Sequence, residues 1–554
     1  MDSNLSQAIK RKIGKKRLFY VCRDIERAAA GLLLDLPNFF IITNDSPYAR
    51  LLVKQYRDKI ILIKEKTHLD THELLSRAMI TTGDLVMVFK PTVAIEKICA
   101  DKGWKLLNPS AELANQVEEK ISQVRWLGPL QKYLPEYKIK TLKEIEFSKT
   151  HFIIQFAHSH TGSGTILIKS KKQLDELRQK FPNRPVRMAK YIKGPLFTNN
   201  NIVWDNKILI GNINYQITGI KPFTNLPFAT IGNDWALPNQ ILSTSQIKQY
   251  KKIATAVGKK LARAGWKGLF GIDVVVDEKT GKLYLLEINA RQPASTTYES
   301  ELQHQKNKHN HSHFRITTFS AHLAAILKIT YFGQKLAAID SGSQIIQRLT
   351  DNQFLKIDKL IIEKNISAFA LHGYHTIVYP SGNHEGDWLR LQTVWGVMSG
   401  HDKLNDEGEK IVGFIATLTA GKVWNRPRAG VIICDQRKIL LMERNKFGNR
   451  YFVVPGGTVE FGESVTAAAR RETTEETGLS FTFDDSSLFT IKGERDEHYF
   501  FATKFDGNPK LGGPENQINR TDNSFRLIWK DVGELKLINL LPPKLKKILT
   551  KRFN

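Results

Sequence analysis

The stretch Gly457–Leu479, GTVEFGESVTAAARRETTEETGL, combines glycines, a run of alanines and many glutamates. Residues 466–477 contain neither Gly nor Pro and are rich in Ala, Arg and Glu, so they predict a helix. Gly478 follows directly, and glycine readily adopts the left-handed conformation that caps a helix C-terminus. The stretch therefore predicts a glycine turn, then a helix with a defined end.

Three glutamates of this helix, Glu472, Glu475 and Glu476, are spaced i, i+3 and i+4, which places their carboxylates on one face. Like charges that are close together repel one another. A solvated acidic helix is one interpretation. The other is a cation site, because hard oxygen ligands suit Mg²⁺ or Mn²⁺. Such a cation can polarise a phosphate and activate a water molecule.

The stretch resembles the Nudix box, a pattern of one glycine, one glutamate and then R-E-U-x-E-E-x-G-U, where U is a bulky aliphatic residue. The matching positions are Gly457, Glu463, Arg471, Glu472, Glu475, Glu476, Gly478 and Leu479. Thr473 departs from the pattern at the first aliphatic position. Because threonine is β-branched and close to valine in shape, we interpret this as a change in packing and not as a lost ligand.

The resemblance implies a metal-dependent hydrolase that acts on nucleoside diphosphates linked to another moiety. The implied metal ligands are Glu472, Glu475 and Glu476, the last two of which are also candidates to orient the attacking water. Arg471 is implied to hold a glutamate in place, Gly457 to let the preceding loop turn back, and Glu463 to brace that loop. The box does not identify the linked moiety.

A second stretch, Gly268–Arg291, predicts two strands joined by a turn at 278–281. Asp273 lies on the first strand. Glu287 and Asn289 lie two residues apart on the second and so share one face. An oxygen-rich set of this kind suits Mg²⁺ bound to nucleotide phosphates. A plain hairpin with an acidic surface is the alternative.

Residues 1–345 resemble the ATP-grasp family, most specifically in Gly268–Arg291, and a Gly/Ser loop, HSHTGSGT, at 158–165 is a weaker part of the resemblance. Backbone N–H groups of such a loop can cover phosphates. The resemblance implies ATP-dependent activation of a carboxylate and its ligation to an amine or thiol. The implied metal ligands are Asp273, Glu287 and Asn289, and the implied nucleotide-binding residues are Lys120, Gly162, Ser163, Gly164 and Arg291.

Two positions depart from this pattern. Gln155 occupies the place where the family usually has a lysine that reaches the phosphates. Lys190 stands in the hinge, Ala189–Gly194, where an acidic residue usually frames the adenine. The sequence therefore leaves open whether this region is an active ligase or a non-catalytic nucleotide-binding domain.

The rest of the chain predicts an α/β multidomain fold. Residues 1–110 contain short apolar runs that alternate with helical stretches and predict an open parallel α/β lobe. The lobe precedes an ATP-grasp-like α+β body at 111–330 and an accessory β/α region at 331–425, to which no chemistry can be assigned. Residues 426–554 are expected to form an α/β/α Nudix sandwich.

The composition narrows the classes of function. A chain of 554 residues with 41% hydrophobic residues is expected to form several globular units. The formal net charge of +27 is compatible with a polyanionic partner, but lysines are spread along the whole chain, and nucleic acid is not the expected main partner. The three cysteines have no metal-ligand spacing, and no long apolar segment is present, so we expect a cytoplasmic protein without membrane contact.

Our preferred hypothesis is a Nudix hydrolase fused to an ATP-grasp-like ligase, with nucleotide-type small molecules as substrates. ATP would be a substrate of the second module, and Mg²⁺ or Mn²⁺ the metal. The alternative is a nucleotide-sensing regulator in which the ATP-grasp region binds without catalysis. The substrates and the oligomeric state cannot be predicted from the sequence.

Overall fold

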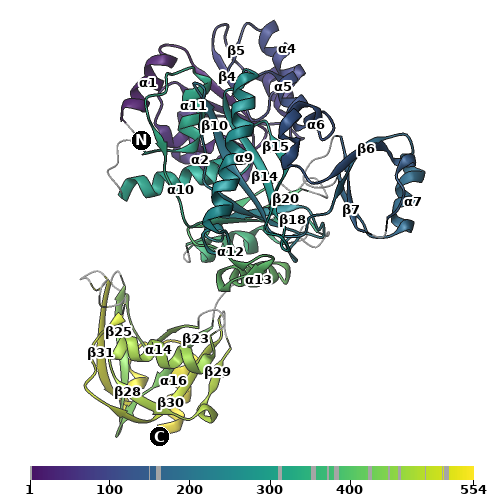
Figure 1. Cartoon of the computed structure of the whole chain (residues 1–554). Helices are drawn as coiled ribbons and strands as arrows, with labels where there is room; N and C mark the ends of the chain where they lie inside the picture. Colours follow the sequence, from purple (N-terminus) through teal and green to yellow (C-terminus); the bar gives the residue numbers. More distant parts are fainter. Residues whose placement is uncertain are drawn as a thin grey trace. The chain divides into compact units, whose positions relative to one another are not determined.

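The structure of the protein is a computed structural model. It describes residues 3–148, 150–157, 164–309, 315–350, 357–370, 373–379, 386–421, 427–446, 449–459, 463–492, 495–513, 516, 519 and 523–553. The chain divides into two compact units, Met1–Thr419 (unit 1) and Ala420–Asn554 (unit 2), which are coloured purple to green and green to yellow in Figure 1. Each unit is described separately.

Unit 1 begins with a sheet in the order β3-β2-β1-β4-β5, in which all pairings are parallel. The strands are β1 Leu18–Val21, β2 Phe39–Asn44, β3 Ile60–Ile63, β4 Leu85–Val88 and β5 Lys105–Leu106. The helices are α1 Ser3–Ile13, α2 Pro47–Gln55, α3 Thr71–Arg77 and α4 Val93–Asp101, with 3-10 turns η1 Ile25–Arg27 and η2 Ala29–Leu34. Alternate residues of β1 pack into two different cores, so this strand is buried on both faces. The predicted open parallel lobe is confirmed.

A four-stranded sheet in the order β6-β9-β7-β8 projects from the side of unit 1 together with α7 (Figure 1). Its strands are β6 Tyr137–Thr141, β7 Phe152–Phe156, β8 Thr165–Ile168 and β9 Pro185–Lys190. The helices of this region are α5 Ala111–Glu118, α6 Ser122–Leu127 and α7 Lys171–Lys180. A small core of its own, which includes Ile154 and Leu174, holds the sheet and α7 together.

A larger sheet forms the body of unit 1 and has the order β15-β14-β10-β12-β13-β18-β20-β19, with β11 beside β10. The strands are β10 Leu196–Trp204, β11 Lys207–Leu209, β12 Asn214–Thr218, β13 Thr230–Asp234, β14 Gly268–Val276, β15 Leu283–Asn289, β18 Ser343–Arg348, β19 His375–Val378 and β20 Asp387–Thr393. Residues 343–393 thus continue the sheet that contains β14 and β15.

Helices and short strands complete unit 1. They are α8 Pro238–Ile241, α9 Thr244–Arg263, α10 Thr296–His309, α11 Thr318–Ile326, α12 Lys359–Ala370 and α13 Asp406–Thr419, with short strands β16 Arg315–Ile316, β17 Lys335–Leu336, β21 Met398–Gly400 and β22 Lys403–Leu404. Every residue of α11 is buried, and several of them share a core with β1, β2 and β10. This core attaches the N-terminal lobe to the body.

Unit 2 contains two packed sheets, one in the order β27-β23-β30-β28 with β29 beside β30, the other in the order β24-β25-β26 with β31 beside β25. The strands are β23 Arg428–Ile432, β24 Cys434–Asp435, β25 Lys438–Lys446, β26 Asn449–Val453, β27 Gly456–Thr458, β28 Ser480–Phe483, β29 Phe489–Ile491, β30 Glu497–Asp506 and β31 Asn523–Asp531, and the helices are α14 Val465–Thr477 and α16 Pro543–Phe553. Ile439 and Leu441 share a core with α16, whereas Leu440 between them shares a core with α14. One helix therefore covers each face, as expected for the α/β/α sandwich.

No helix in the described part of the chain has the length and apolar character that crossing a membrane requires.

Candidate active sites

The glutamate-bearing helix of unit 2 is α14, and its ends agree with the sequence prediction. The Ser464 side chain accepts a hydrogen bond from the Ala467 N–H at the start, and Gly478 at the end has φ +66°. Ala468 and Ala469 face the core. Glu472 and Glu476 follow Ala468 at intervals of four residues and so lie along the same side of the helix, where Glu476 is buried, whereas Glu475 is exposed.

The turn that begins β27 packs directly against the glutamates of α14. The Gly456 N–H donates a hydrogen bond to Oε2 of Glu476 at 2.7 Å. A Cβ atom at Gly457 would overlap the Glu472 carboxylate in its present position, so a larger residue would require that side chain to move. The backbone turn therefore holds both carboxylates near β27.

Arg471 links the helix to the loop before it. Its Nε and Nη2 atoms each donate to the Glu463 carboxylate at 2.9 Å, and Nη1 lies 2.8 Å from Glu472 and 3.7 Å from Glu475. The paired hydrogen bonds to Glu463, followed by the contact with Glu472, raise the pKa of Arg471. Arg471 is thus the charge partner of two of the predicted metal ligands, and Glu463 orients it.

The donor set of α14 fits a hard divalent cation in its chemistry, because all three side chains offer carboxylate oxygens. The three carboxylates are not already arranged around a common metal position. Across the described ranges, no three His, Cys, Asp or Glu side chains already converge as a metal-binding group. Glu472 is turned to Arg471, and Glu476 accepts from Gly456. A bound cation would compete with Arg471 for the Glu472 carboxylate.

Thr473 makes contacts that an aliphatic residue could not make. It is fully buried. Its hydroxyl accepts a hydrogen bond from the Val431 N–H at 3.1 Å and donates one to the Pro455 carbonyl at 3.3 Å. The hydroxyl thereby ties α14 to β23 and to the turn before Gly456. Thr473 therefore replaces the usual aliphatic residue with a side chain of similar shape that also forms two hydrogen bonds.

Replacing Thr473 by Val is therefore expected to destabilise unit 2 by about 1–3 kcal/mol, because it leaves a buried N–H without a partner. Chemical denaturation of the full chain, followed by a signal from unit 2, measures the change. Thr474 is exposed on the same helix, so Thr474→Val is the matched control and should change the stability by less than about 0.5 kcal/mol. Equal stability of the two variants would contradict the assigned role of the hydroxyl.

In unit 1 the antiparallel pairing of β14 and β15 brings the predicted metal ligands together. Asp273 lies directly opposite Glu287, and the Asn289 Nδ2 donates to Oδ2 of Asp273 at 3.4 Å. Burial raises the pKa of Asp273 to about 6, and the Glu287 charge adds to this rise. Two carboxylates and one amide oxygen in such proximity fit Mg²⁺.

Lys120 lies between α5 and α6, and its Nζ forms an ion pair with Glu287 at 2.6 Å. Burial alone would raise the pKa of Glu287, but the Lys120 ammonium more than offsets it, so that the pKa of Glu287 is lowered. Lys120 itself is 5% exposed. The structure thus places the predicted nucleotide lysine at the predicted metal ligands.

Arg291 follows β15 and donates to the Glu118 carboxylate, which also binds Lys90. Of the predicted glycine loop, Gly164 is described, and its carbonyl accepts a hydrogen bond from the Phe156 N–H at 3.1 Å. The other two predicted loop residues, Gly162 and Ser163, lie outside the described residues.

A cavity of about 500 Å³ lies between the projecting sheet and the body of unit 1. Its lining is largely apolar and includes Ile153, Ile192, Leu196, Val275 and Leu286. The hinge predicted at Ala189–Gly194 also lines it, and Lys190 is exposed there. Gly194 has φ +150°, and a Cβ atom would overlap the carbonyl of Val276, so the hinge approaches β14 closely.

Sequence reasoning missed Arg187, a buried arginine in the wall of this cavity. Its Nε donates to Oε1 of Gln155 at 2.8 Å and its Nη2 to the Leu286 carbonyl at 3.0 Å. Its Nη1 is buried and has no hydrogen-bond partner among the residues described. Burial lowers the pKa of Arg187 to about 10, so the group remains charged at neutral pH.

Arg187 places a cation beside the position where the family pattern has its lysine. Gln155 on β7 and Arg187 on β9 are direct cross-strand neighbours. The Arg187 guanidinium thus lies on the strand next to the position where the family pattern has its lysine. The sequence around Arg187 carries no motif that would have singled it out.

Comparison with known protein families identifies both regions. A model of the NUDIX domain matches residues 424–551, and a model of the ATP-grasp domain matches residues 117–295. The chain therefore contains a C-terminal NUDIX domain and, before it, an ATP-grasp domain. Domains of these two families bind nucleotide-type small molecules, and they indicate a hydrolase and a ligase, respectively.

Solved structures with a similar fold include N5-carboxyaminoimidazole synthetase from Staphylococcus aureus complexed with ADP, at 12% identity and a TM-score of 0.48, covering 72% of this chain and 97% of that one. Carboxyaminoimidazole ribonucleotide synthase from Aspergillus clavatus complexed with ATP has 16% identity and a TM-score of 0.49, covering 74% and 99%. An L-amino acid ligase from Bacillus licheniformis has 14% identity and a TM-score of 0.48, covering 73% and 98%. Similarity at this level does not identify a substrate.

Proposed function

We propose that unit 2 hydrolyses the diphosphate bond of a nucleoside diphosphate linked to another moiety. The observation that carries this proposal is the packing of the Gly456–Gly457 turn on Glu472 and Glu476, which holds carboxylates against a backbone turn. Glu472, Glu475 and Glu476 would hold a divalent cation, Mg²⁺ or Mn²⁺. When bound, the cation supplies charge neutralisation at the phosphates and lowers the pKa of a bound water.

The residues of unit 2 have separate tasks in this reaction. Arg471 balances the charge of the glutamates until the cation arrives, and Glu463 keeps its guanidinium in place. The Gly456 N–H engages one oxygen of Glu476, which fixes that side chain. An oriented carboxylate at this position accepts a proton from the attacking water or directs the water by a hydrogen bond.

Hydrolysis of a panel of nucleoside triphosphates, nucleotide sugars and dinucleotides tests this proposal. We expect turnover of one class of compound with Mg²⁺ and no turnover with a chelator. Absence of turnover on every class, in a preparation whose unit 2 is folded, would contradict the proposal.

We propose that unit 1 binds MgATP and uses it to activate a carboxylate for ligation to an amine or thiol. Asp273, Glu287 and Asn289 would hold Mg²⁺, which supplies charge neutralisation between the phosphates. Lys120, Arg187 and Arg291 surround the same region with positive charge. The apolar cavity beside the hinge is suited to a flat heterocycle.

A nucleotide-sensing role without ligation is the second candidate, and Gln155 favours it, because the usual cation is absent at that position. The two candidates differ in turnover. A ligase releases ADP and inorganic phosphate from ATP when both substrates are present, whereas a sensor binds ATP and releases neither.

Replacing Arg187 by Met is expected to weaken ATP binding roughly 10- to 100-fold, because a hydrogen bond to a charged group contributes about 1.5–3 kcal/mol. Binding of adenosine, which lacks phosphates, should change much less. Titration calorimetry with both compounds measures the difference. Arg125→Met, at an exposed position of α6, is the matched control. An equal loss of affinity for ATP and adenosine would assign Arg187 a structural role only.

A further inference from the structure

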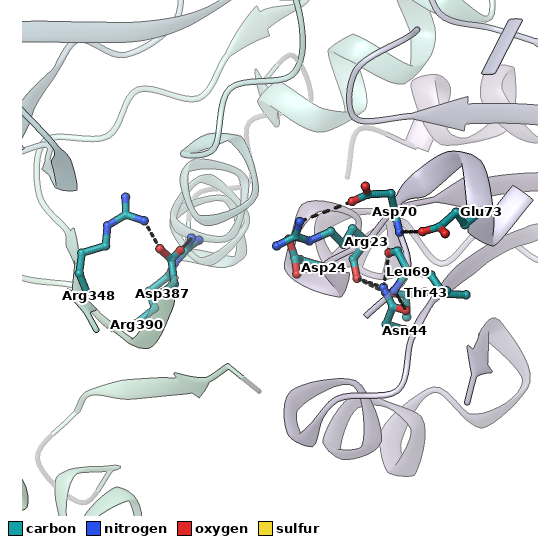
Figure 2. Close-up of polar contacts among 10 residues, drawn as sticks. All are labelled: Arg23, Asp24, Thr43, Asn44, Leu69, Asp70, Glu73, Arg348, Asp387 and Arg390. Carbon is teal, nitrogen blue, oxygen red and sulfur yellow. Dashed lines mark hydrogen bonds and ion pairs between the residues drawn. The ribbon is translucent and has the colours of Figure 1, made fainter. Parts of the chain in front are cut away.

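A cluster of buried polar side chains lies in unit 1 between the N-terminal lobe and the body, outside the sites described above. Its members are Glu26 and Arg27 on η1, Tyr379 directly after β19, and Arg390 on β20. We refer to these residues as the Arg390 cluster. Figure 2 shows its surroundings, with Arg390 beside Asp387 on one side and Arg23 and Asp24 of the lobe on the other.

Arg390 is a buried cation whose guanidinium is not fully hydrogen-bonded, although the acidic groups of Glu26, Asp24, Asp387 and Glu301 lie near it. It is 3% exposed, and its Nε has no hydrogen-bond partner within the described ranges. The Asp387 carboxylate lies 3.9 Å from its Nη2 but bonds to Arg348 instead. The guanidinium also lies 5.7 Å from the centre of the Tyr379 ring. A buried charge in such an environment carries a large desolvation cost.

The other members of the cluster also have unsatisfied polar atoms. Arg27 Nη1 and the Tyr379 hydroxyl are buried without a hydrogen-bond partner among the residues that the structure describes. Glu26 is 6% exposed. Burial raises the pKa of Glu26, while the nearby Arg390 charge and its own N–H lower it. Donors and an acceptor of opposite charge are therefore close together without being bonded to one another.

Hydrogen bonds to the backbone anchor the turn that carries Glu26 and Arg27. The Arg27 carbonyl accepts hydrogen bonds from Gln292 Nε2 at 2.7 Å and from Thr297 Oγ1 at 3.2 Å. Gln292 is itself held by the Tyr20 hydroxyl at 2.8 Å. The 3-10 turn that carries Glu26 and Arg27 is thus anchored to Gln292 and Thr297 through one carbonyl. A ligand that offers both an anionic and a cationic group would satisfy the cluster, and a ligand with only one of them would not.

The cluster adjoins the proposed phosphate site. The guanidiniums of Arg27 and Arg291 lie 4.6 Å and 5.8 Å from the centre of the same Phe89 ring. Gln292, which fixes η1, directly follows Arg291 and donates its backbone N–H to the Phe89 carbonyl at 3.3 Å. A molecule bound in the cluster is therefore close to Arg291 and to the end of β15.

We propose that the Arg390 cluster binds a small zwitterion with the charge pattern of an α-amino acid, as one of the two substrates that unit 1 joins. Its carboxylate binds to Arg390 and Arg27, and its ammonium group binds to Glu26. The phenol of Tyr379 adds a hydrogen bond. This inference rests on the proposed ligase function, since that function supplies the need for a second small molecule beside the phosphate site.

Calorimetric titration of the full chain with free amino acids, in the presence of MgATP, tests the inference. We expect a subset of amino acids to bind. The matched carboxylic acids without the amine, and the matched amines without the carboxylate, should bind at least tenfold more weakly. Equal affinity of a carboxylic acid and its amino acid would overturn the assignment of Glu26.

Two variants test the residues. Arg390→Met and Glu26→Gln should each weaken amino-acid binding at least tenfold, and Arg390→Lys should restore part of it. The affinity for ATP reports whether unit 1 remains folded. Arg50→Met, at an exposed arginine of the lobe, is the control and should change nothing. Unchanged amino-acid affinity in both cluster variants would overturn the proposal.

The proposed function and this inference fail differently. If ATP binds and no amino acid does, the zwitterion site is wrong while the nucleotide site stands. If neither ATP nor an amino acid binds, both proposals for unit 1 are wrong.

Discussion

Replacing Glu476 by Gln is expected to lower kcat/KM for diphosphate hydrolysis by roughly 10²- to 10⁴-fold, the range found when a group acting on the proton or water of the reaction is lost. The Gly456 N–H can still bond to the amide oxygen, so the turn and helix should remain in place. The substitution removes the charge of a proposed metal ligand, which is also the proposed acceptor for the water proton. Steady-state kinetics with the substrate found in the panel measure the change.

The control for this experiment is Glu534→Gln, which removes an exposed carboxylate of unit 2 that forms an ion pair with Lys530 on the surface. It should leave hydrolysis unchanged. A Glu476→Gln protein that retains most of its activity, with the control also active, would show that the carboxylates of α14 do not hold the reactive metal.

Replacing Glu287 by Gln is expected to weaken binding of MgATP roughly 10- to 100-fold and to abolish any ATP-dependent ligation. Glu287 is paired with Lys120 and lies opposite Asp273, so the change removes both a proposed metal ligand and the partner of a buried ammonium. Binding of ATP in the presence of a chelator should be affected much less. Comparing the two titrations separates the metal contribution from the nucleotide contribution.

Glu176→Gln on the exposed face of α7 is the matched control and should bind MgATP as the wild type does. The same loss of affinity with and without Mg²⁺ in Glu287→Gln would contradict the role of this residue as a metal ligand. That result would mean that Glu287 acts only as the ion-pair partner of Lys120.

Much of the fold can be predicted from local patterns. The helix at 465–477 is predictable because a run of residues with high helix propensity ends at a glycine. Helix propensity and glycine capping both depend on residues that are close together in the sequence. The strands of the N-terminal lobe were predictable because continuous apolar runs mark strands that are buried on both faces. These features depend on neighbours in the sequence.

Features that depend on distant residues were not predictable. The sheet of unit 1 pairs β13 with β18, and no local signal relates residues 230–234 to residues 343–348. The sequence predicts only a packing change at Thr473, since its hydrogen bonds go to Val431 and Pro455, which only the fold brings near it. Local propensity carries no information on such contacts.

In the candidate sites, too, features set by nearby residues are predictable, and features set by distant residues are not. Glu287 and Asn289 share one face of a strand by the period of two, and the structure places Asp273 opposite Glu287. Arg187 and Arg390 were missed, because a single arginine in an apolar strand has no motif around it. Their significance arises from burial without full hydrogen bonding, which only the structure reveals.

The central claim is that the chain has two separate phosphate-handling sites, one in each unit. Measuring hydrolysis and MgATP binding side by side in Glu476→Gln and Glu287→Gln tests it most directly. We expect Glu476→Gln to lose hydrolysis and to bind MgATP normally. We expect Glu287→Gln to lose MgATP binding and to hydrolyse the diphosphate substrate normally. Loss of both activities in either variant, or loss of neither in both, would contradict it.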